Sequence, residues 1–464
     1  MNFTALDKTI RKIMRGKNTP GLALSLVHDG KLVYAKGFGS RNLKAYSPMD
    51  ENTLIGIGSI TKSFTAFAIL KLQEAGKLNI EDSAADYLDY GLFTERPEIK
   101  IKHMLSHSTG IPSMDAGGKH FAYTFNDLSC IYPVETREQF ITHLSDAAEF
   151  IVHSPGEHFF YNNDMYSCLA FIIEDLSGIS FEQFLQQEIL QPLEMNRAVL
   201  TQQALDSDPD QNVMTGYRFE SRDGGVHAMA SDVPIGGNVQ APGGIYTSMT
   251  EMANYALCLL NNGEFKGQQL LSPASVALLF TPQMSTPYGR GADPQYCLGW
   301  SKDDKTEQMP HTVIHHGGVM LTSSSHLMLI PSLNLAVSVA ENASTGLCAM
   351  VADAVVATLL KQDPAAVIED LKIVNALDEI EGTYKSPHNM YSLTLSRKNG
   401  MLWADAQIDD GAVSFALLVK DIDQLVFARY SLRADNKNLI RFVRNKTTGK
   451  IEYVTYDRYL YRRQ

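Results

Sequence analysis

The chain has 464 residues, enough for two or three domains of ordinary size with large apolar cores. Hydrophobic residues make up 44% and charged residues 20%, which is typical of a globular protein. The net charge of −12 and the absence of a basic block argue against binding to nucleic acid or to anionic membranes.

The cysteines are odd in number and scattered, and none forms a CxxC pair: Cys130, Cys168, Cys258, Cys297 and Cys348. This spacing predicts neither a zinc site nor a disulfide framework, and it favours a reducing compartment. The N-terminal stretch MNFTALDKTIRKIMRGKN has apolar residues at helical spacing without a continuous apolar run, which predicts a surface helix and not a signal peptide. No apolar run approaches the roughly 20 residues that span a bilayer. We therefore predict a cytoplasmic protein with no metal, cofactor, nucleic-acid or membrane partner.

The first part of the chain predicts a mixed α/β (α+β) domain over residues 1–375. Residues 21–39, GLALSLVHDGKLVYAKGFG, predict two strands joined at Asp29-Gly30, because both positions of such a turn favour positive φ. Helical periodicity follows over residues 63–78, 164–190 and 249–265, and strands return over 326–342 before a last helix over 350–363. This order predicts an antiparallel sheet built from both ends of the segment, flanked by helices, with a helical subdomain inserted between them.

The sequence pattern changes near Glu379. Residues 391–407 predict two strands around Asn399-Gly400, and residues 439–463 continue as strand, turn and strand without helical periodicity. Short strands at regular spacing predict a second domain over residues 376–464, a small antiparallel β-barrel or sandwich, of which we expect the barrel. The boundary is expected in residues 361–382, where a proline and charged residues interrupt the apolar periodicity.

Ser59 and Lys62 are the first candidate catalytic pair, in TLIGIGSITKSFTAFAIL (residues 53–70). Residues three apart are neighbours on a helix, so the lysine amine can reach the serine hydroxyl and act as its base. The structural alternative is a serine that caps the helix and a lysine in solvent. A phosphate-binding loop is rejected, because Thr61 stands where that loop requires glycine.

Two further short patterns carry polar side chains. Tyr161 and Asn163 have Tyr-x-Asn spacing just before a long apolar helix, so a phenol and an amide can line one wall; core packing of the tyrosine is the alternative. His316, Gly317 and Gly318 enter a strand in TVIHHGGVMLTSSSHLMLIP, where glycines allow close approach of a ligand and a strand N–H can serve as an oxyanion donor. A β-bulge with histidines facing solvent is the alternative here.

In this order, SxxK, YxN and HxG resemble the motifs of the serine β-lactamase and penicillin-binding-protein-like family. More narrowly, they are similar to those of the class C β-lactamase and D-aminopeptidase branch, the CubicO-type peptidases and esterases. Four further segments are similar to family sequences at the corresponding positions, so the resemblance covers about residues 1–360. These segments are IKHMLSHSTGIPS, SPGEHFFYNND, ILQPLEMNRA and APGGIYTSMTEMANYALCLLNNGEF.

The resemblance implies a serine hydrolase that forms an acyl-enzyme at Ser59. Lys62 and Tyr161 would share the proton transfers, with the ammonium lowering the pKa of the phenol so that a phenolate acts as general base. Asn163 would orient Lys62 and the substrate amide. The N–H groups of Ser59 and Val319, beside Gly318, would form the oxyanion hole.

One departure from the family bears on the substrate. Many relatives have Lys-Thr-Gly at the third motif, whose cation recognises a carboxylate, whereas this chain has no Lys-Thr-Gly. His316, which we predict to bind the substrate, is mostly neutral near pH 7. Its imidazole can hydrogen-bond a substrate carbonyl or ester oxygen but supplies no cation, which favours peptides, amides or esters without a carboxylate beside the scissile bond. We predict a D-aminopeptidase-like peptidase, with a carboxylesterase or weak β-lactamase as the alternative within this fold.

The C-terminal strands, which begin at EIEGTY (residues 379–384), resemble the lipocalin-like barrels attached to some CubicO-type peptidases. Those relatives imply a homo-oligomer that limits substrate access, and a stabilising domain without a ligand is the alternative. Two other classes of function stay open at this point: a catalytically idle scaffold, and a ligand carrier centred on the barrel. The second is disfavoured because the segment is short for a barrel with a large cavity.

Overall fold

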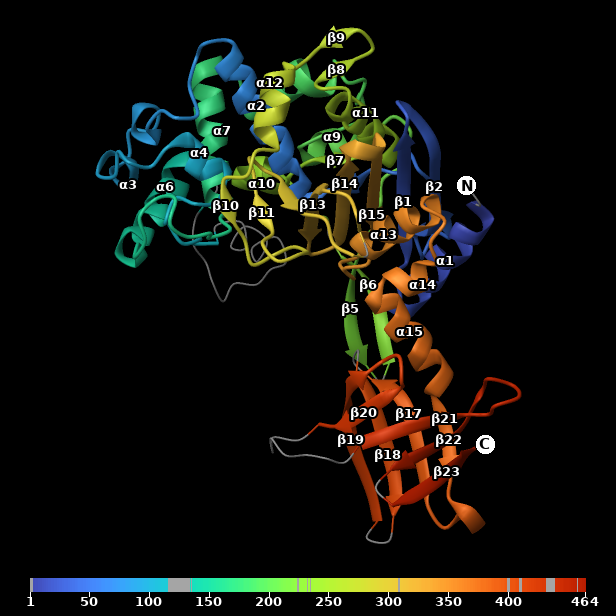
Figure 1. Cartoon of the computed structure of the whole chain (residues 1–464). Helices are drawn as coiled ribbons and strands as arrows, with labels where there is room; N and C mark the ends of the chain where they lie inside the picture. Colours follow the sequence, from blue (N-terminus) through green and yellow to red (C-terminus); the bar gives the residue numbers. More distant parts are fainter. Residues whose placement is uncertain are drawn as a thin grey trace. The chain divides into compact units, whose positions relative to one another are not determined.

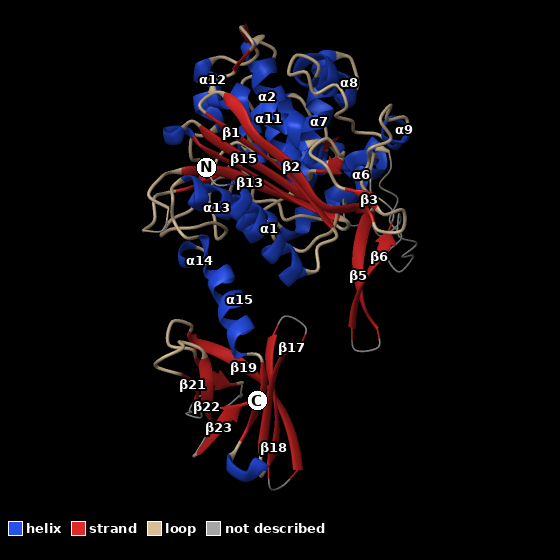
Figure 2. Cartoon of the chain, turned by 90° about the vertical axis from the view of Figure 1, so that its right-hand side faces the viewer, coloured by secondary structure: helices blue, strands red, loops and turns tan. Residues whose placement is uncertain are grey.

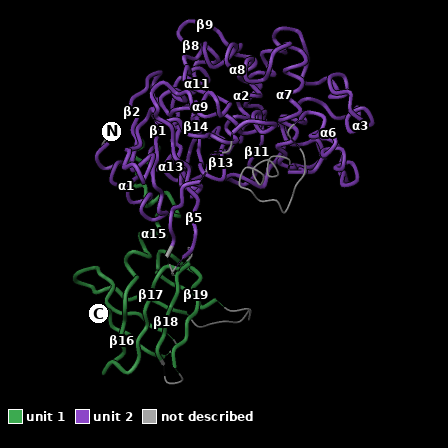
Figure 3. The backbone as a smooth tube through the Cα atoms, turned by 180° about the vertical axis from the view of Figure 1, so that it is seen from behind, with its two compact units in different colours: residues 1–2, 356–464 green, residues 3–355 purple. Residues whose placement is uncertain are grey.

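The computed structural model describes residues 3–115, 134, 136–222, 225–231, 233, 235–307, 309–398, 401–408, 411–430, 439–456 and 458–464. These residues form two compact units, one over 3–355 and one over 356–464 (Figure 3). The predicted domain boundary after residue 375 falls within helix α15 (Glu369–Ile380) and stays a prediction.

A nine-stranded sheet forms the framework of the first unit. Its longer strands can be followed in Figure 1. Its order is β10-β11-β12-β13-β14-β15-β1-β2-β3, and β1 pairs antiparallel with β15, with Leu22 opposite Glu341. Strands from the two ends of the segment therefore meet in one sheet, which confirms the predicted fold class. The strands are β1 (Gly21–His28), β2 (Lys31–Asn42), β3 (Ser47–Pro48), β10 (Met284–Ser285), β11 (Gln295–Tyr296), β12 (Ser301–Asp303), β13 (Val313–Met320), β14 (Ser323–Ile330) and β15 (Leu335–Glu341).

The hairpin between β1 and β2 turns at Asp29 and Gly30, as predicted. Their φ angles are +51° and +73°, so both central residues lie in the left-handed region that this turn requires. Three two-stranded ribbons lie outside the main sheet. They are β4 (Ile55–Gly56) with β7 (Tyr246–Thr247), β5 (Gly216–Arg222) with β6 (Gly225–Ser231), and β8 (Glu264–Phe265) with β9 (Gln268–Gln269).

Helices cover both faces of the sheet (Figure 2). Helices α1 (Phe3–Lys17) and α13 (Cys348–Leu359) lie on one face, and α2 (Thr61–Glu74), α7 (Asn163–Ser177) and α11 (Met249–Leu260) lie on the other. Helix α2 is buried on every side from Thr61 to Leu70, and Lys62 is the one charged residue in that stretch. No helix in the described ranges is long and apolar enough to cross a membrane.

The shorter helices of the first unit lie in the segments that connect its longer helices and strands. They are α3 (Gly91–Thr94), α4 (Ile101–Leu105), α6 (Arg137–Ser145), α8 (Phe181–Leu185), α9 (Gln202–Asp206), α10 (Gln240–Gly243) and α12 (Pro273–Leu279).

The second unit contains a closed eight-stranded β-barrel, as the sequence predicted. Strand β16 pairs with the last strand, β23, with Tyr384 opposite Arg463, and this pairing closes the barrel. Buried Leu393, Phe427, Val454 and Tyr461 help to fill its core. The elements are α14 (Pro364–Val367), α15, β16 (Gly382–Lys385), β17 (Ser392–Lys398), β18 (Met401–Ile408), β19 (Gly411–Asp421), β20 (Val426–Arg429), β21 (Leu439–Arg444), β22 (Ile451–Tyr456) and β23 (Tyr459–Arg463).

Candidate active site

Ser59 lies in a single 3₁₀ turn, Gly58–Ile60, directly ahead of α2. The segment before it is tied to strand β14: the hydroxyl of Ser323 donates to the Gly56 carbonyl (2.8 Å) and that of Ser325 donates to the Ile57 carbonyl (2.6 Å). Gly58 has a φ of +51°, a conformation that favours glycine. The serine is therefore presented on a turn that the sheet holds from behind.

Lys62 lies one helical turn after Ser59, and its Nζ is 3.0 Å from the Ser59 Oγ. The same Nζ donates to the Pro242 carbonyl of α10 at 2.8 Å. The side chain is fully buried, and burial lowers the pKa of Lys62 well below its ordinary value of 10.5. Burial therefore favours the neutral amine, the form of lysine that can accept a proton from the serine.

Tyr161 meets this pair from the segment ahead of α7. Its side chain interacts with that of Ser59, and the Lys62 Nζ lies 4.7 Å from the centre of its ring. Burial raises the pKa of Tyr161 above its ordinary value of 10. This direction is opposite to the one expected from the sequence, where an ammonium was to lower the pKa of the phenol. Burial thus favours a neutral phenol beside a neutral amine, in place of the expected phenolate beside an ammonium.

Asn163 is the first residue of α7 and is half-buried. The preceding Asn162 caps the helix, because its Oδ1 accepts the backbone N–H of Asp164 at 2.8 Å. The cap fixes where the helix starts and so where Tyr161 and Asn163 stand. The predicted role of Asn163 in orienting Lys62 stays a prediction.

His316 lies in β13 and is buried. Its Nδ1 lies 2.6 Å from the Gly317 carbonyl and its Nε2 lies 3.0 Å from the Tyr296 hydroxyl. With Nδ1 donating, Nε2 accepts from the tyrosine, so both nitrogens have protein partners. Burial is the largest cause that lowers the pKa of His316, to about 3. The ring is thus neutral, as the sequence predicted, but it can bind a substrate only if Tyr296 releases it.

The neighbouring His315 belongs to the opposite face of β13. Its Nε2 lies 3.2 Å from the Asp303 carboxylate, so it is engaged away from His316. The alternation of buried and more exposed residues along β13 accounts for this separation.

Gly318 and Val319 bring β13 against the nucleophile turn. A methyl group on Gly318 would lie 1.9 Å from the Ile57 carbonyl oxygen, and one on Gly58 would lie 2.8 Å from the Val319 backbone nitrogen. The two backbones therefore approach too closely for side chains at either glycine. In the described sheet, β12 pairs with β13 only as far as His315, so the edge beyond it has no strand neighbour on that side.

Three residues in or beside this cluster were not among the sequence candidates: Pro242, Tyr296 and His107. The Pro242 carbonyl binds Lys62, Tyr296 binds His316, and the His107 ring centre lies 4.2 Å from that of Tyr161. His107 and Pro242 lie in segments that resemble family sequences, but the local sequence does not indicate which atom of each segment contacts the site.

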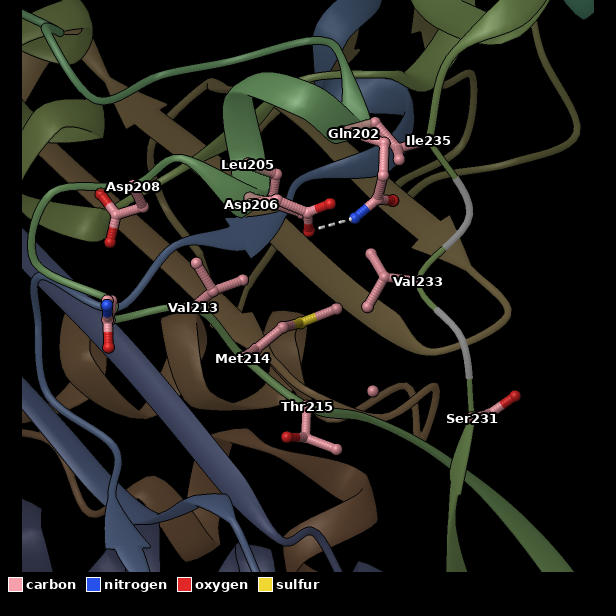
Figure 4. A pocket seen from close by; sticks show the side chains of 12 residues that line it. Gln202, Leu205, Asp206, Asp208, Val213, Met214, Thr215, Ser231, Val233 and Ile235 are labelled. Carbon is pink, nitrogen blue, oxygen red and sulfur yellow. Dashed lines mark hydrogen bonds between the residues drawn. The ribbon is translucent and has the colours of Figure 1, made fainter.

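A separate cavity of about 660 Å³ lies between α9 and the base of the β5–β6 ribbon (Figure 4). Leu205, Met214 and Val233 give it an apolar lining, and Gln202 donates to the Asp206 carboxylate at 2.8 Å beside them. The Met214 N–H donates to the Leu54 carbonyl at the start of the segment that leads to Ser59. None of the sequence candidates lines this cavity.

The described cysteines, Cys168, Cys258, Cys297 and Cys348, are buried and form no disulfide. Cys130 lies outside the described residues. Within the described ranges, no three His, Cys, Asp or Glu side chains gather in an arrangement that could hold a metal ion.

A helix-covered antiparallel sheet, with a serine and a lysine at the head of its buried helix, defines the class of β-lactamase-fold proteins. The family model described as Beta-lactamase matches residues 6–360, and the chain belongs to that family. This match confirms the resemblance at the level of the family.

Individual relatives agree with this assignment. The putative penicillin-binding protein PbpX of Bacillus subtilis (strain 168) is 30% identical over 57% of this chain and 60% of its own length. Protein flp of Staphylococcus aureus (strain MW2) is 24% identical over 73% of this chain and 62% of its own. The chain thus spans about six tenths of these two curated relatives.

Among solved structures, the octameric penicillin-binding protein homologue from Pyrococcus abyssi is similar over nearly the whole chain. It is 27% identical with a TM-score of 0.84, covering 99% of this chain and 100% of its own. The likeness therefore includes the C-terminal barrel as well as the β-lactamase-like unit.

Proposed function

We propose that this protein is a serine hydrolase that acts through an acyl-enzyme on small peptides or amides, as a D-aminopeptidase-like peptidase. The observation that carries the proposal is the cluster in which Lys62 Nζ lies 3.0 Å from Ser59 Oγ and the Tyr161 side chain interacts with the same serine. A base and a second proton carrier on one hydroxyl are what nucleophilic catalysis by serine requires. Membership of the β-lactamase family supports the same reading.

The geometry supports a proton path that begins at Lys62. The neutral amine accepts the Ser59 proton as Oγ attacks the carbonyl carbon and forms the tetrahedral intermediate. Tyr161 donates its proton to the leaving nitrogen as the carbon–nitrogen bond breaks, and it recovers a proton from the Lys62 ammonium. The amine is then neutral again, and the acyl group remains on Ser59.

Hydrolysis of the acyl-enzyme uses the same groups in the reverse sense. Water attacks the acyl carbon while Tyr161 accepts its proton and passes the phenol proton to the Lys62 amine, and the Lys62 ammonium returns a proton to the Ser59 Oγ as the bond between that oxygen and the acyl carbon breaks. The N–H groups of Ser59 and Val319 stabilise the oxyanion in both steps, a contribution of about 2.7–4 kcal/mol per donor in enzymes of this kind. Asn163 orients the substrate amide at the mouth of the cluster.

The substrate class follows from the charge at His316. A neutral ring, with its pKa lowered to about 3, supplies no cation for a substrate carboxylate. We therefore place amides and esters without an adjacent carboxylate ahead of β-lactams and acids that end in D-alanine. This reading is consistent with the class C β-lactamase and D-aminopeptidase branch, and a carboxylesterase is the alternative with the same machinery.

We also propose a cytoplasmic homo-oligomer. The solved homologue from Pyrococcus abyssi is described as octameric and aligns over nearly the whole chain, which supports assembly here. Four buried, reduced cysteines are consistent with a reducing compartment.

Labelling with a fluorophosphonate, followed by mass spectrometry of the modified peptide, tests the proposal. We expect modification at Ser59 in the wild-type protein and none in Ser59→Ala. A panel of L- and D-amino-acid amides, p-nitrophenyl esters and nitrocefin then ranks the substrate classes. A folded wild-type protein that is not labelled and hydrolyses nothing on the panel would favour the idle scaffold.

A further inference from the structure

His107 is a buried titratable residue beside the cluster that the proposed mechanism does not use. It follows α4, and it is fully buried with a φ of +57°. A left-handed conformation is uncommon for a residue other than glycine, with Asn, Asp and His the most frequent exceptions. At His107 the backbone carbonyl and the side chain both face the same neighbouring segment. That neighbour is the segment that carries Tyr161.

His107 binds this segment on both sides of Tyr161. Its backbone carbonyl accepts the N–H of Phe160 at 2.8 Å, and its Nδ1 accepts the N–H of Asn162 at 3.0 Å. Its ring lies between them against the Tyr161 ring, with the centres 4.2 Å apart. One residue therefore fixes the backbone before and after Tyr161 and also supports its ring.

The ring is held in the form that this contact needs. Burial holds the pKa of His107 well below its ordinary value of 6.5. The neutral ring can keep Nδ1 as an acceptor, which places its proton on Nε2. A protonated ring would turn Nδ1 into a donor facing the Asn162 N–H, and the contact would be lost.

Simple core packing does not explain the choice of histidine. Among the described residues, Nε2 has no hydrogen-bond partner, and the ring is surrounded by Tyr166, Tyr296 and Phe159. A buried polar group left unpaired is unfavourable, so an apolar residue would pack this position better if packing were its only role. What histidine adds is the Nδ1 acceptor at the Asn162 N–H.

We propose that His107 is a positioning residue that holds Tyr161 in hydrogen-bond reach of Ser59 by binding the backbone on both of its sides. Only the expected loss of kcat rests on the proposed function. The placement of Tyr161 by His107 can be measured independently of activity.

Two substitutions separate the acceptor from the backbone conformation. Both glycine and asparagine adopt a left-handed φ readily, but only asparagine retains an acceptor on Cγ, where Nδ1 is attached in histidine. We expect His107→Gly to lower kcat about 100-fold, the size of effect that a misplacement of about 1 Å produces, with little change in KM. His107→Asn should restore most of kcat. If the glycine variant does not fold, His107→Ala takes its place.

His103 provides the matched control. Its Nδ1 also accepts a backbone N–H, from Lys100 at 3.1 Å, but at the start of α4 instead of beside Tyr161. His103→Ala should lower the thermal unfolding midpoint without changing kcat by more than about twofold. A loss of kcat in His103→Ala equal to that in His107→Gly would overturn the inference, because general destabilisation would then explain both.

A double-mutant cycle with Tyr161→Phe isolates the path of the effect. If His107 acts through the Tyr161 hydroxyl, His107→Gly should have almost no further effect on kcat in the Tyr161→Phe background. Full multiplication of the two losses would overturn the inference.

Crystal structures of the variants provide the readout that does not depend on activity. We expect the Tyr161 ring to be displaced in His107→Gly and to be in place in His107→Asn. An unmoved ring in His107→Gly would overturn the inference even in an active enzyme. If the wild-type protein proves inactive, the proposed function fails, and this displacement alone decides whether His107 positions Tyr161.

Discussion

Replacing Gly318 with alanine would place a methyl group between β13 and the nucleophile turn. That carbon would lie 1.9 Å from the Ile57 carbonyl oxygen and 2.4 Å from the Ser325 hydroxyl oxygen. An ordinary carbon–oxygen contact is about 3.3 Å, so the strand and the turn must separate by more than about 1 Å. The Ile57 atom in this overlap is a backbone oxygen close to Ser59, so no side-chain rotation can relieve the overlap.

This separation would move apart the two donors of the proposed oxyanion hole, because the N–H groups of Ser59 and Val319 lie on opposite sides of the contact. Loss of one such donor typically costs about 2.7–4 kcal/mol, or about 10²–10³ in kcat. Overpacking should also lower the free energy of unfolding by about 1–3 kcal/mol. We therefore expect a folded but less stable Gly318→Ala variant with a greatly reduced kcat and a KM close to that of the wild type.

Gly317→Ala is the matched control, one residue earlier in the same strand. A methyl group there would meet nothing closer than 3.9 Å, and Gly317 needs no positive φ. Its kcat should stay within about twofold of the wild type, since an ordinary contact adds no strain. Both variants are compared by steady-state hydrolysis of the best substrate from the panel, by the rate of fluorophosphonate labelling at Ser59, and by thermal unfolding. Equal kcat values for Gly318→Ala and Gly317→Ala in folded proteins would refute the close-approach argument and the oxyanion assignment with it.

Further predictions concern the proton path, its pH dependence, the substrate and the two units. Lys62→Ala and Tyr161→Phe should each reduce kcat severely, and the double variant should lose little more, because both act on one proton path; losses that multiply in the double variant would contradict this. Burial lowers the pKa of Lys62 well below 10.5, and the amine must be unprotonated to accept the serine proton, so kcat/KM should rise with pH through the Lys62 pKa and level off above it. A kcat/KM that falls over that pH range in stopped-flow or steady-state assays would count against a neutral amine. His316→Lys should shift the ratio of kcat/KM for a matched amide–acid pair toward the carboxylate-bearing substrate, and an unchanged ratio would mean that residue 316 does not contact the substrate. Deleting residues from 377 onward should leave a folded β-lactamase-like domain, since each unit has a core of its own, as circular dichroism and thermal unfolding would show. A truncated chain that cannot fold would mean that the boundary is misplaced.

Short-range patterns in the sequence were sufficient for the framework of this protein. The turn at Asp29 and Gly30, the apolar helix after Ser59 and the closely spaced C-terminal strands all depend on a few neighbouring residues. The period of the apolar residues, the residue types in turns and the spacing of residues along a helix all depend on residues close together in the chain. The fold class and the barrel could therefore be predicted. The spacing of Ser59 and Lys62 likewise predicted that the two side chains would meet, and they do.

The ionisation states at the site depended instead on residues far apart in the chain. The resemblance to the family implied an ammonium near a tyrosine and hence a phenolate, but burial moves the pKa of Lys62 down and that of Tyr161 up. The cost of removing a charge from water is set by everything that surrounds the group, and no local pattern reports it.

The same reason explains the contacts that sequence analysis missed. The Pro242 carbonyl reaches Lys62 across 180 residues of chain, and the Tyr296 hydroxyl occupies the His316 nitrogen that a substrate was expected to bind. His107 supports Tyr161 from a left-handed position over fifty residues earlier. Residue types and spacing predicted which groups could take part in the proposed catalysis. Only the tertiary structure decided their protonation and their partners, because hydrogen bonding and desolvation are set by atoms that folding brings together.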